Sequence, residues 1–145
     1  MCLQDQRTYP CEPASPGHAR AYCREHLGPV MGHVADGREV VSTTELVITE
    51  LMTNAINAGC SGEITLELAL HHNHLQVSVQ DNAPGQPRVK QPSASNEHGR
   101  GLHIVATLAT SWGVVPVVGG KQVWADLAVP AAATAALSCA RRGNH

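Results

Sequence analysis

The sequence has no phenylalanine, and only two tryptophans and two tyrosines among its 145 residues. A core must therefore be built from aliphatic side chains, which the 43% hydrophobic content supplies. No apolar run reaches the roughly 18–20 residues needed to cross a bilayer, and residues 1–7 lack the start of a secretory signal. The formal net charge of -2 gives no electrostatic case for binding nucleic acid or an anionic membrane.

Closely spaced cysteine pairs are also missing. The five cysteines form no C-x-x-C pair and are odd in number. This predicts reduced thiols, a cytoplasmic protein and no zinc site. Three of the nine histidines cluster at His71, His72 and His74, between two strand-like segments. Neighbouring residues at strand ends point apart, so we predict a polar hairpin turn there and no metal site.

The rest of the sequence is typical of one domain over 1–145, with its core at about 15–129 and an alanine-rich tail at 130–145. The apolar stripe is clearest in the helix at 39–58, and strict alternation predicts two hairpins. Ser15 is the predicted N-cap of the first helix, which Gly28 and Pro29 should end. The predicted elements are a short strand near 7–9, helices at 16–27, 39–58 and 101–110, and strands at 63–70, 75–79, 112–118 and 122–129. Their order predicts an α+β, two-layer sandwich, with helices on one face of a mainly antiparallel mixed sheet.

Glu50 and Asn54 form the first polar pair of interest. They are four residues apart on the predicted helix, which places them on one side, about 40° from each other. Asn54 offers a neutral oxygen suited to magnesium, and Glu50 can take a proton from an attacking hydroxyl. An ordinary solvated helix face is the alternative interpretation of this pair alone.

Asp81 ends an apolar strand and precedes Asn-Ala-Pro-Gly85. A carboxylate there can accept a hydrogen bond from an exocyclic amine such as that of adenine, and Gly85 lets the backbone approach a ring closely. The same residue types also form simple strand-end turns. Both interpretations stay open for this segment taken alone.

Gly99-Arg100-Gly101-Leu102 follows a long segment without periodicity and opens the next predicted helix. Free N–H groups at a helix start suit a phosphate chain, and Arg100 can add charge-assisted hydrogen bonds. A glycine-hinged helix start is the alternative. The chain contains neither a G-x-x-x-x-G-K-[ST] loop nor a G-x-G-x-x-G after a strand.

In combination, Glu50-x-x-x-Asn54, Asp81-x-x-x-Gly85 and Gly99-x-Gly101 resemble the three boxes of the Bergerat-fold ATPases, the GHKL or histidine-kinase-like superfamily. Within it, the chain is similar over about 15–129 to the stand-alone anti-sigma-factor serine/threonine kinases of bacteria. The shared phrases are Glu-Leu-Met-Thr-Asn-Ala, Gly-Arg-Gly-Leu, Ser-Trp-Gly and Gly-Gly-Lys-Gln-Val-Trp.

The resemblance implies a kinase that uses ATP and Mg²⁺. Glu50 would be the general base, Asn54 the magnesium ligand, Asp81 the adenine-reading residue and 86–98 a flexible lid. The residues that it implies for ATP binding are Asn54, Asn57, Asp81, Gly85, Gly99, Arg100, Gly101, Leu102 and Gln122.

The implied partners are a sigma factor, an anti-anti-sigma antagonist that is phosphorylated on serine or threonine, and a second copy in a homodimer. Three positions depart from the family pattern: Asn57, where the family often has a basic residue, Ala58, where it often has histidine, and Gln122, where it often has threonine. These departures favour an alternative, a catalytically weak or inactive nucleotide-binding module that acts by sequestering its partner.

Overall fold

The computed structural model describes residues 4–83 and 97–143, and within these ranges the side chains of 4–83 and 102–137. The elements are, in chain order, β1 (Gln4–Pro10), α1 (Ser15–Met31), α2 (Gly37–Asn57), β2 (Glu63–His71), β3 (His74–Asp81), α3 (Glu97–Leu108), β4 (Ser111–Val117), β5 (Gly120–Ala128) and α4 (Ala131–Gly143).

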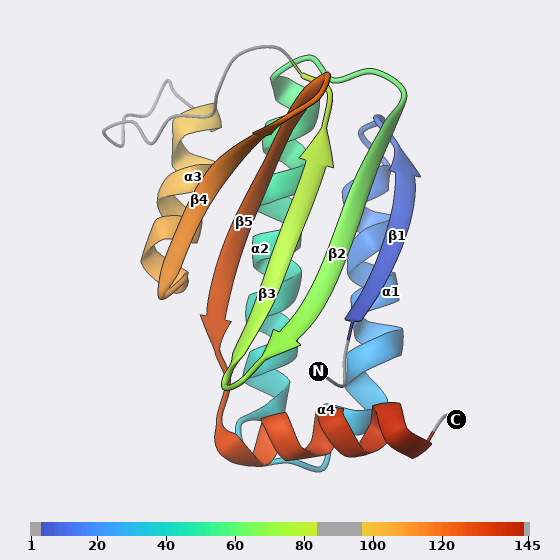
Figure 1. Ribbon diagram of the computed structural model, residues 1–145, viewed down its shortest axis with the longest axis vertical. Helices are drawn as coiled ribbons and strands as arrows, with labels where there is room; N and C mark the ends of the chain where they lie inside the picture. Colours follow the sequence, from blue (N-terminus) through green and yellow to red (C-terminus); the bar gives the residue numbers. More distant parts are fainter. Residues whose placement is uncertain (1–3, 84–96, 144–145) are drawn as a thin grey trace.

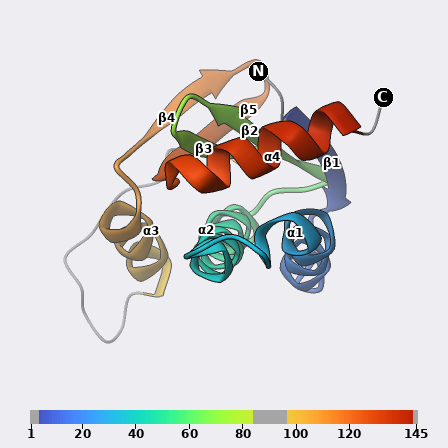
Figure 2. The same ribbon diagram turned by 90° about the horizontal axis from the view of Figure 1, so that it is seen from below.

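The strands form one five-stranded sheet in the order β1-β2-β3-β5-β4. Every strand pair within the described ranges is antiparallel. Helices α1, α2 and α3 lie side by side along one face of the sheet, and α4 crosses its lower end (Figures 1 and 2). The predicted α+β two-layer architecture with helices on one face is confirmed.

The core lies between the sheet and these helices and is almost wholly aliphatic. Alternate residues of β2, β3 and β5 face it, and the apolar stripe of α2 packs against them from the other side. Its largest fully buried side chains include Ile48, Leu51, Met52, Ile64, Leu66, Leu68, Leu75 and Val77. Period-2 and period-3.6 patterns therefore placed the central elements correctly.

The histidine cluster forms the predicted hairpin turn. His71 and His74 are paired across the β2–β3 ladder, and His72 adopts a left-handed conformation with φ of 55°. No group of three metal-ligating side chains occurs anywhere in the described part of the chain.

The start and the end of α1 differ from the prediction. The helix continues through Gly28 and Pro29 to Met31, although an internal proline lacks one helical donor and crowds the preceding turn. Leu27 and Met31, on either side of Pro29, are fully buried in the core. Ser15 is not the N-cap; it is the first helical residue, after Ala14. Its hydroxyl is buried and donates to the carbonyl oxygen of Pro10, which ties the start of α1 to the end of β1.

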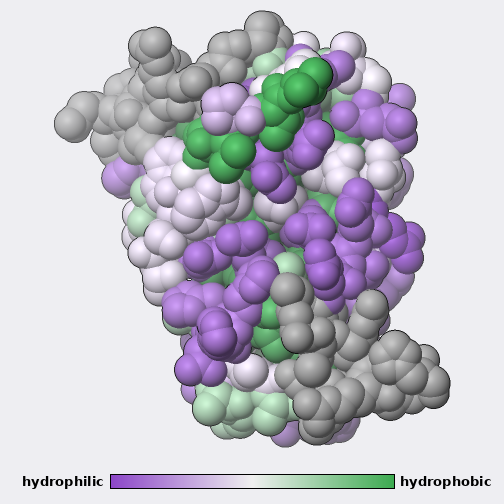
Figure 3. Space-filling model, in the orientation of Figure 1, coloured by the Kyte–Doolittle hydropathy of each residue, from purple (hydrophilic) through white to green (hydrophobic). Residues whose placement is uncertain are grey.

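The other face of the sheet carries no helix from the described residues. Figure 3 shows polar residues over most of this face and hydrophobic residues at its upper end, where the β4–β5 hairpin lies. Val115 and Val118 are exposed there. None of the helices in the ranges 4–83 and 97–143 is long and apolar enough to cross a membrane.

Cys11 and Cys60 form a disulfide, so the prediction of reduced cysteines is wrong for this pair. The two Cα atoms are 6.1 Å apart, although 49 positions separate the residues in sequence. β1 ends beside the segment that follows α2, where the Cys11 N–H donates to the Gly62 carbonyl at 2.8 Å. The disulfide also removes the cysteine argument for a cytoplasmic location, since structural disulfides are rare in that compartment.

Removing this disulfide is expected to lower the free energy of unfolding by about 2–4 kcal/mol, because it closes a long loop in the unfolded chain. Urea denaturation of wild type and Cys11→Ser, each with and without dithiothreitol, measures the effect. The reductant should destabilise wild type and leave Cys11→Ser unchanged. Identical denaturation of wild type in both conditions would show that the disulfide contributes no stability.

Candidate nucleotide site

Four chain segments that carry the predicted motifs meet at the upper end of the molecule. They are the last turns of α2, the end of β3, the start of α3 and the start of β5 (Figure 1). Antiparallel pairing of β3 with β5 brings the end of one strand to the start of the other. The fold thus gathers at one end residues that lie tens of positions apart in sequence.

Glu50 and Asn54 occupy one side of α2, both half-buried. Their neighbours Leu51, Met52 and Ala55 are buried in the core, so the polar pair flanks the apolar stripe as predicted. Burial raises the pKa of the Glu50 carboxyl above its ordinary value. A carboxylate with a raised pKa is a better proton acceptor, which suits a general base.

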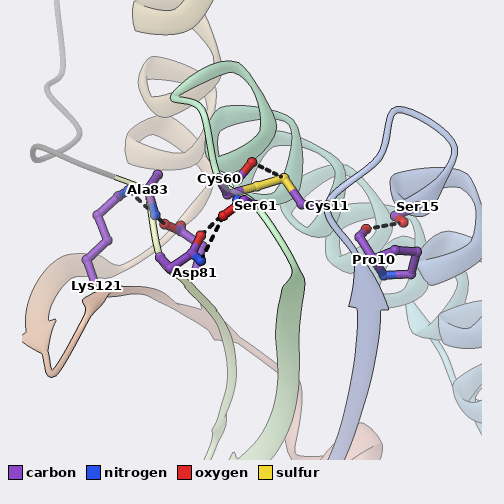
Figure 4. The surroundings of a disulfide bond; sticks show 9 residues. Pro10, Cys11, Ser15, Cys60, Ser61, Asp81, Ala83 and Lys121 are labelled. Carbon is purple, nitrogen blue, oxygen red and sulfur yellow. Dashed lines mark hydrogen bonds and ion pairs between the residues drawn. A yellow bond between two sulfur atoms is a disulfide. The ribbon is translucent and has the colours of Figure 1, made fainter.

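Asp81 is buried at the end of β3 beside Lys121 of β5 (Figure 4). The Lys121 ammonium donates to Oδ1 of Asp81 at 3.0 Å, and the Ala83 N–H donates to the same oxygen at 2.7 Å. Lys121 and Asp81 are directly opposite in the β3–β5 ladder. The carboxylate is therefore held in place by a charged and a neutral donor.

The backbone around Asp81 is closely packed. A Cβ atom on Gly120 would lie 1.9 Å from the Asp81 carbonyl oxygen, so only glycine fits beside β3 at this point. On the other side, Oδ1 of Asn82 accepts from the Ser61 N–H at 2.8 Å. Ser61 follows Cys60 of the disulfide, so this hydrogen bond connects the residue after Asp81 to the disulfide-linked segment (Figure 4).

The structure does not bring every predicted residue to this place. Gln122 pairs with Gln80 and Val115, which places it on the opposite face of the sheet from Asp81. Leu102 is fully buried in the core, which leaves only its backbone for a ligand. Asn57 ends α2 and is exposed.

The glycine motif lies early in α3. Gly99, Arg100 and Gly101 belong to the first two turns of this helix, which begins at Glu97. The predicted lid at 86–98 and Gly85 lie outside the described residues, apart from the last two lid positions, which are part of α3. The helix thus begins four positions before the predicted start at 101, and the role of the glycine motif toward a phosphate chain stays a prediction.

Lys121 is the site residue that the sequence analysis missed. The predicted strands at 112–118 and 122–129 leave Lys121 in the turn between them, whereas β5 begins at Gly120 and Lys121 is buried. The signal was available, because Lys121 continues the alternation of the core residues Val123, Ala125 and Leu127. A lysine in phase with a buried face indicates a buried partner.

Magnesium would have to be shared between the protein and a nucleotide. Asn54 supplies one neutral oxygen, and no three-ligand cluster occurs within 4–83 or 97–143. Mg²⁺ commonly takes few protein ligands and completes its shell with phosphate oxygens and water. The side chains thus fit a magnesium ion that is bound together with a triphosphate.

A separate cavity of about 300 Å³ lies at the other end of the molecule. It is lined by the start of α2, including Glu39 and Val40, by Leu108 at the end of α3 and by Leu127 of β5. None of the predicted site residues lines it, so it does not belong to the nucleotide site.

Comparison with known proteins assigns the fold to a family. Residues 13–127 match the histidine kinase-like ATPase domain, and the chain belongs to this family. A solved structure with a similar fold is the histidine kinase domain from the Erythrobacter litoralis EL346 blue-light activated histidine kinase, with 20% identity and a TM-score of 0.51. That match covers 89% of this chain and 65% of the other chain. No curated protein sequence matches this chain.

Residues 13–127 are therefore a histidine kinase-like ATPase domain, which implies ATP as the ligand. The predicted superfamily is thereby confirmed, and the assignment of ATP as its ligand is supported. The anti-sigma-factor subtype, the serine/threonine specificity and the role of each site residue stay predictions.

Proposed function

We propose that this domain transfers the terminal phosphate of ATP to a serine or threonine of an anti-anti-sigma antagonist, and that it sequesters a sigma factor. One observation carries the catalytic part. Glu50, half-buried and with a raised pKa, lies one helical turn before Asn54, at the end of the fold where Asp81 lies. A base and a magnesium ligand on one rigid helix meet the main requirement of phosphoryl transfer, which is positioning.

Each site residue has a separate role in the proposed phosphoryl transfer. Glu50 takes the proton of the acceptor hydroxyl while that oxygen bonds to the terminal phosphorus and the bond from phosphorus to ADP breaks. Asn54 would hold a magnesium ion through its amide oxygen, and the ion would neutralise charge on the phosphates. Asp81 accepts a hydrogen bond from the exocyclic amine of adenine, and the N-terminal turns of α3 face the phosphates.

The partners are proposed from the sequence resemblance: a sigma factor, an antagonist and a second copy of the chain. The alternative function is a module that binds nucleotide and captures its partner without phosphotransfer. Gln122 supports this alternative, because its side chain lies on the face of the sheet opposite Asp81.

One experiment separates the two functions. The protein is used to capture partners from the native cytoplasm with and without ATP, and the captured proteins are then incubated with radiolabelled ATP and Mg²⁺. Phosphate on a serine or threonine of a captured antagonist supports the kinase. Capture of a sigma factor without phosphotransfer to any captured protein would favour the sequestering module.

Asp81→Asn is expected to weaken ATP binding by about 1–3 kcal/mol, or about 5- to 150-fold, because the variant loses a charged acceptor in a buried site. Isothermal titration calorimetry with Mg²⁺ measures the change, and circular dichroism verifies folding. Asp126→Asn is the matched control, since Asp126 lies at the far end of β5 and bonds to Gln76. Equal affinity of wild type and Asp81→Asn would refute the adenine assignment.

A further inference from the structure

The Lys121 ammonium makes fewer hydrogen bonds with the described residues than it has donors. Its side chain is only 3% exposed, and that of Asp81 only 1%. An ammonium group carries three donors, yet within the described residues Nζ has one partner, Oδ1 of Asp81. A buried charge with unused donors is costly unless another acceptor is supplied.

The Asp81 carboxylate likewise accepts fewer hydrogen bonds from the described residues than its two oxygens can accept. Both of its hydrogen bonds with described residues, from Lys121 and from the Ala83 N–H, go to Oδ1. Oδ2 can therefore accept from another group. Together, Lys121 and Asp81 present a donor directly beside an acceptor, both of them buried.

This arrangement complements a heterocyclic edge on which an acceptor lies beside a donor. Adenine has such an edge, since its ring nitrogen N1 is an acceptor and the adjacent exocyclic amine is a donor. We propose that Lys121 reads the base together with Asp81, donating to N1 while Oδ2 of Asp81 accepts from the amine. This inference rests on the proposed nucleotide binding and adds a base-reading residue to it.

The local backbone keeps the two groups in register. Asp81 and Lys121 are partners in the β3–β5 ladder, and the hairpin lies so close to β3 that a Cβ on Gly120 would be 1.9 Å from the Asp81 carbonyl oxygen. Lys121 cannot shift along the strand without displacing this contact. A donor held in this way is preorganised for a ligand, which lowers the cost of binding.

The test compares ligands that differ in one atom. Affinities of wild type for ATP, 1-deaza-ATP and 7-deaza-ATP are measured by calorimetry with Mg²⁺. Loss of N1 should weaken binding about 10- to 100-fold, the usual worth of a hydrogen bond to a charged group. N7 makes no contact in this proposal, so 7-deaza-ATP should bind with the same affinity as ATP.

Variants of Lys121 then test whether discrimination between ATP and 1-deaza-ATP depends on the lysine. Lys121→Met should bind ATP and 1-deaza-ATP equally, whereas Lys121→Arg, which keeps a donor, should still discriminate between them. If Lys121→Met does not fold, the same comparison is made with Asp81→Asn/Lys121→Met, in which no charge is left unpaired. A purely structural lysine would change stability without removing the discrimination.

Three results would overturn the inference, and each would have a different meaning. Equal binding of ATP and 1-deaza-ATP by wild type would show that Lys121 does not read N1, while nucleotide binding itself would stand. Failure of all three ligands to bind would refute the proposed function and the inference with it. Tighter ATP binding by Lys121→Met would show instead that the lysine blocks the site.

Discussion

Glu50→Gln is expected to reduce phosphotransfer about 10²- to 10⁴-fold, the usual contribution of a general base, while ATP affinity stays unchanged. The amide keeps the size of the side chain but cannot accept the hydroxyl proton. Glu50 lies beside the apolar stripe of α2 and outside it, so the variant should fold. Single-turnover transfer from radiolabelled ATP to a verified antagonist, together with calorimetry of ATP binding, measures both quantities.

Two variants of the same helix serve as controls. Glu45→Gln makes the same chemical change on the side of α2 that faces α1, where Glu45 pairs with Arg24, and it should leave transfer intact. Asn54→Ala should lose both transfer and ATP affinity, because the magnesium bridge to the phosphates is lost. Unchanged transfer in Glu50→Gln would show that another group, or none, acts as the base.

The pH dependence of transfer tests the same assignment. Burial raises the pKa of Glu50, and only the ionised carboxylate can accept a proton. The rate in wild type should therefore fall as the pH drops through this raised pKa and level off above it. The residual rate of Glu50→Gln should lack this acidic limb.

Much of the fold follows from local patterns, because its main elements are strongly periodic. The alternation of Ile64, Leu66 and Leu68 predicted β2, and the stripe that includes Ile48 and Leu51 predicted α2 to within two residues at its start. Where the prediction was wrong, a local rule was outweighed by packing. Pro29 was expected to end α1 but lies within it, between Leu27 and Met31, which are both fully buried in the core.

The remaining features depend on contacts between distant residues. Nothing in the spacing of Cys11 and Cys60 indicates a disulfide, because the pairing arises only when β1 lies against β2 and α1 against α2. The same holds for Asp81 and Lys121, which are 40 positions apart. For this second pair, a sequence motif locates Asp81, and the sheet register supplies Lys121 as its partner.

Lys121→Met should lower the free energy of unfolding by about 3–5 kcal/mol, because it leaves the Asp81 carboxylate buried without its counter-charge. Asp81→Asn/Lys121→Met should recover most of this loss. Both charges are then absent, and the amide oxygen can still accept from the Ala83 N–H, which now donates to Oδ1 at 2.7 Å. Urea denaturation of wild type, both single variants and the double variant gives the coupling energy of the pair.

A surface ion pair provides the matched control. Arg24 and Glu45 join α1 to α2, but the Arg24 side chain is 55% exposed, against 3% for Lys121. Solvent screens such a pair, so Arg24→Met should cost no more than about 1 kcal/mol. If Lys121→Met costs as little as Arg24→Met, water must reach Asp81 in the folded protein. A base-reading site that excludes water would then be untenable. A large loss of unfolding free energy in Lys121→Met, with recovery in the double variant, would show that Asp81 and Lys121 form a desolvated charge pair at the end of β3.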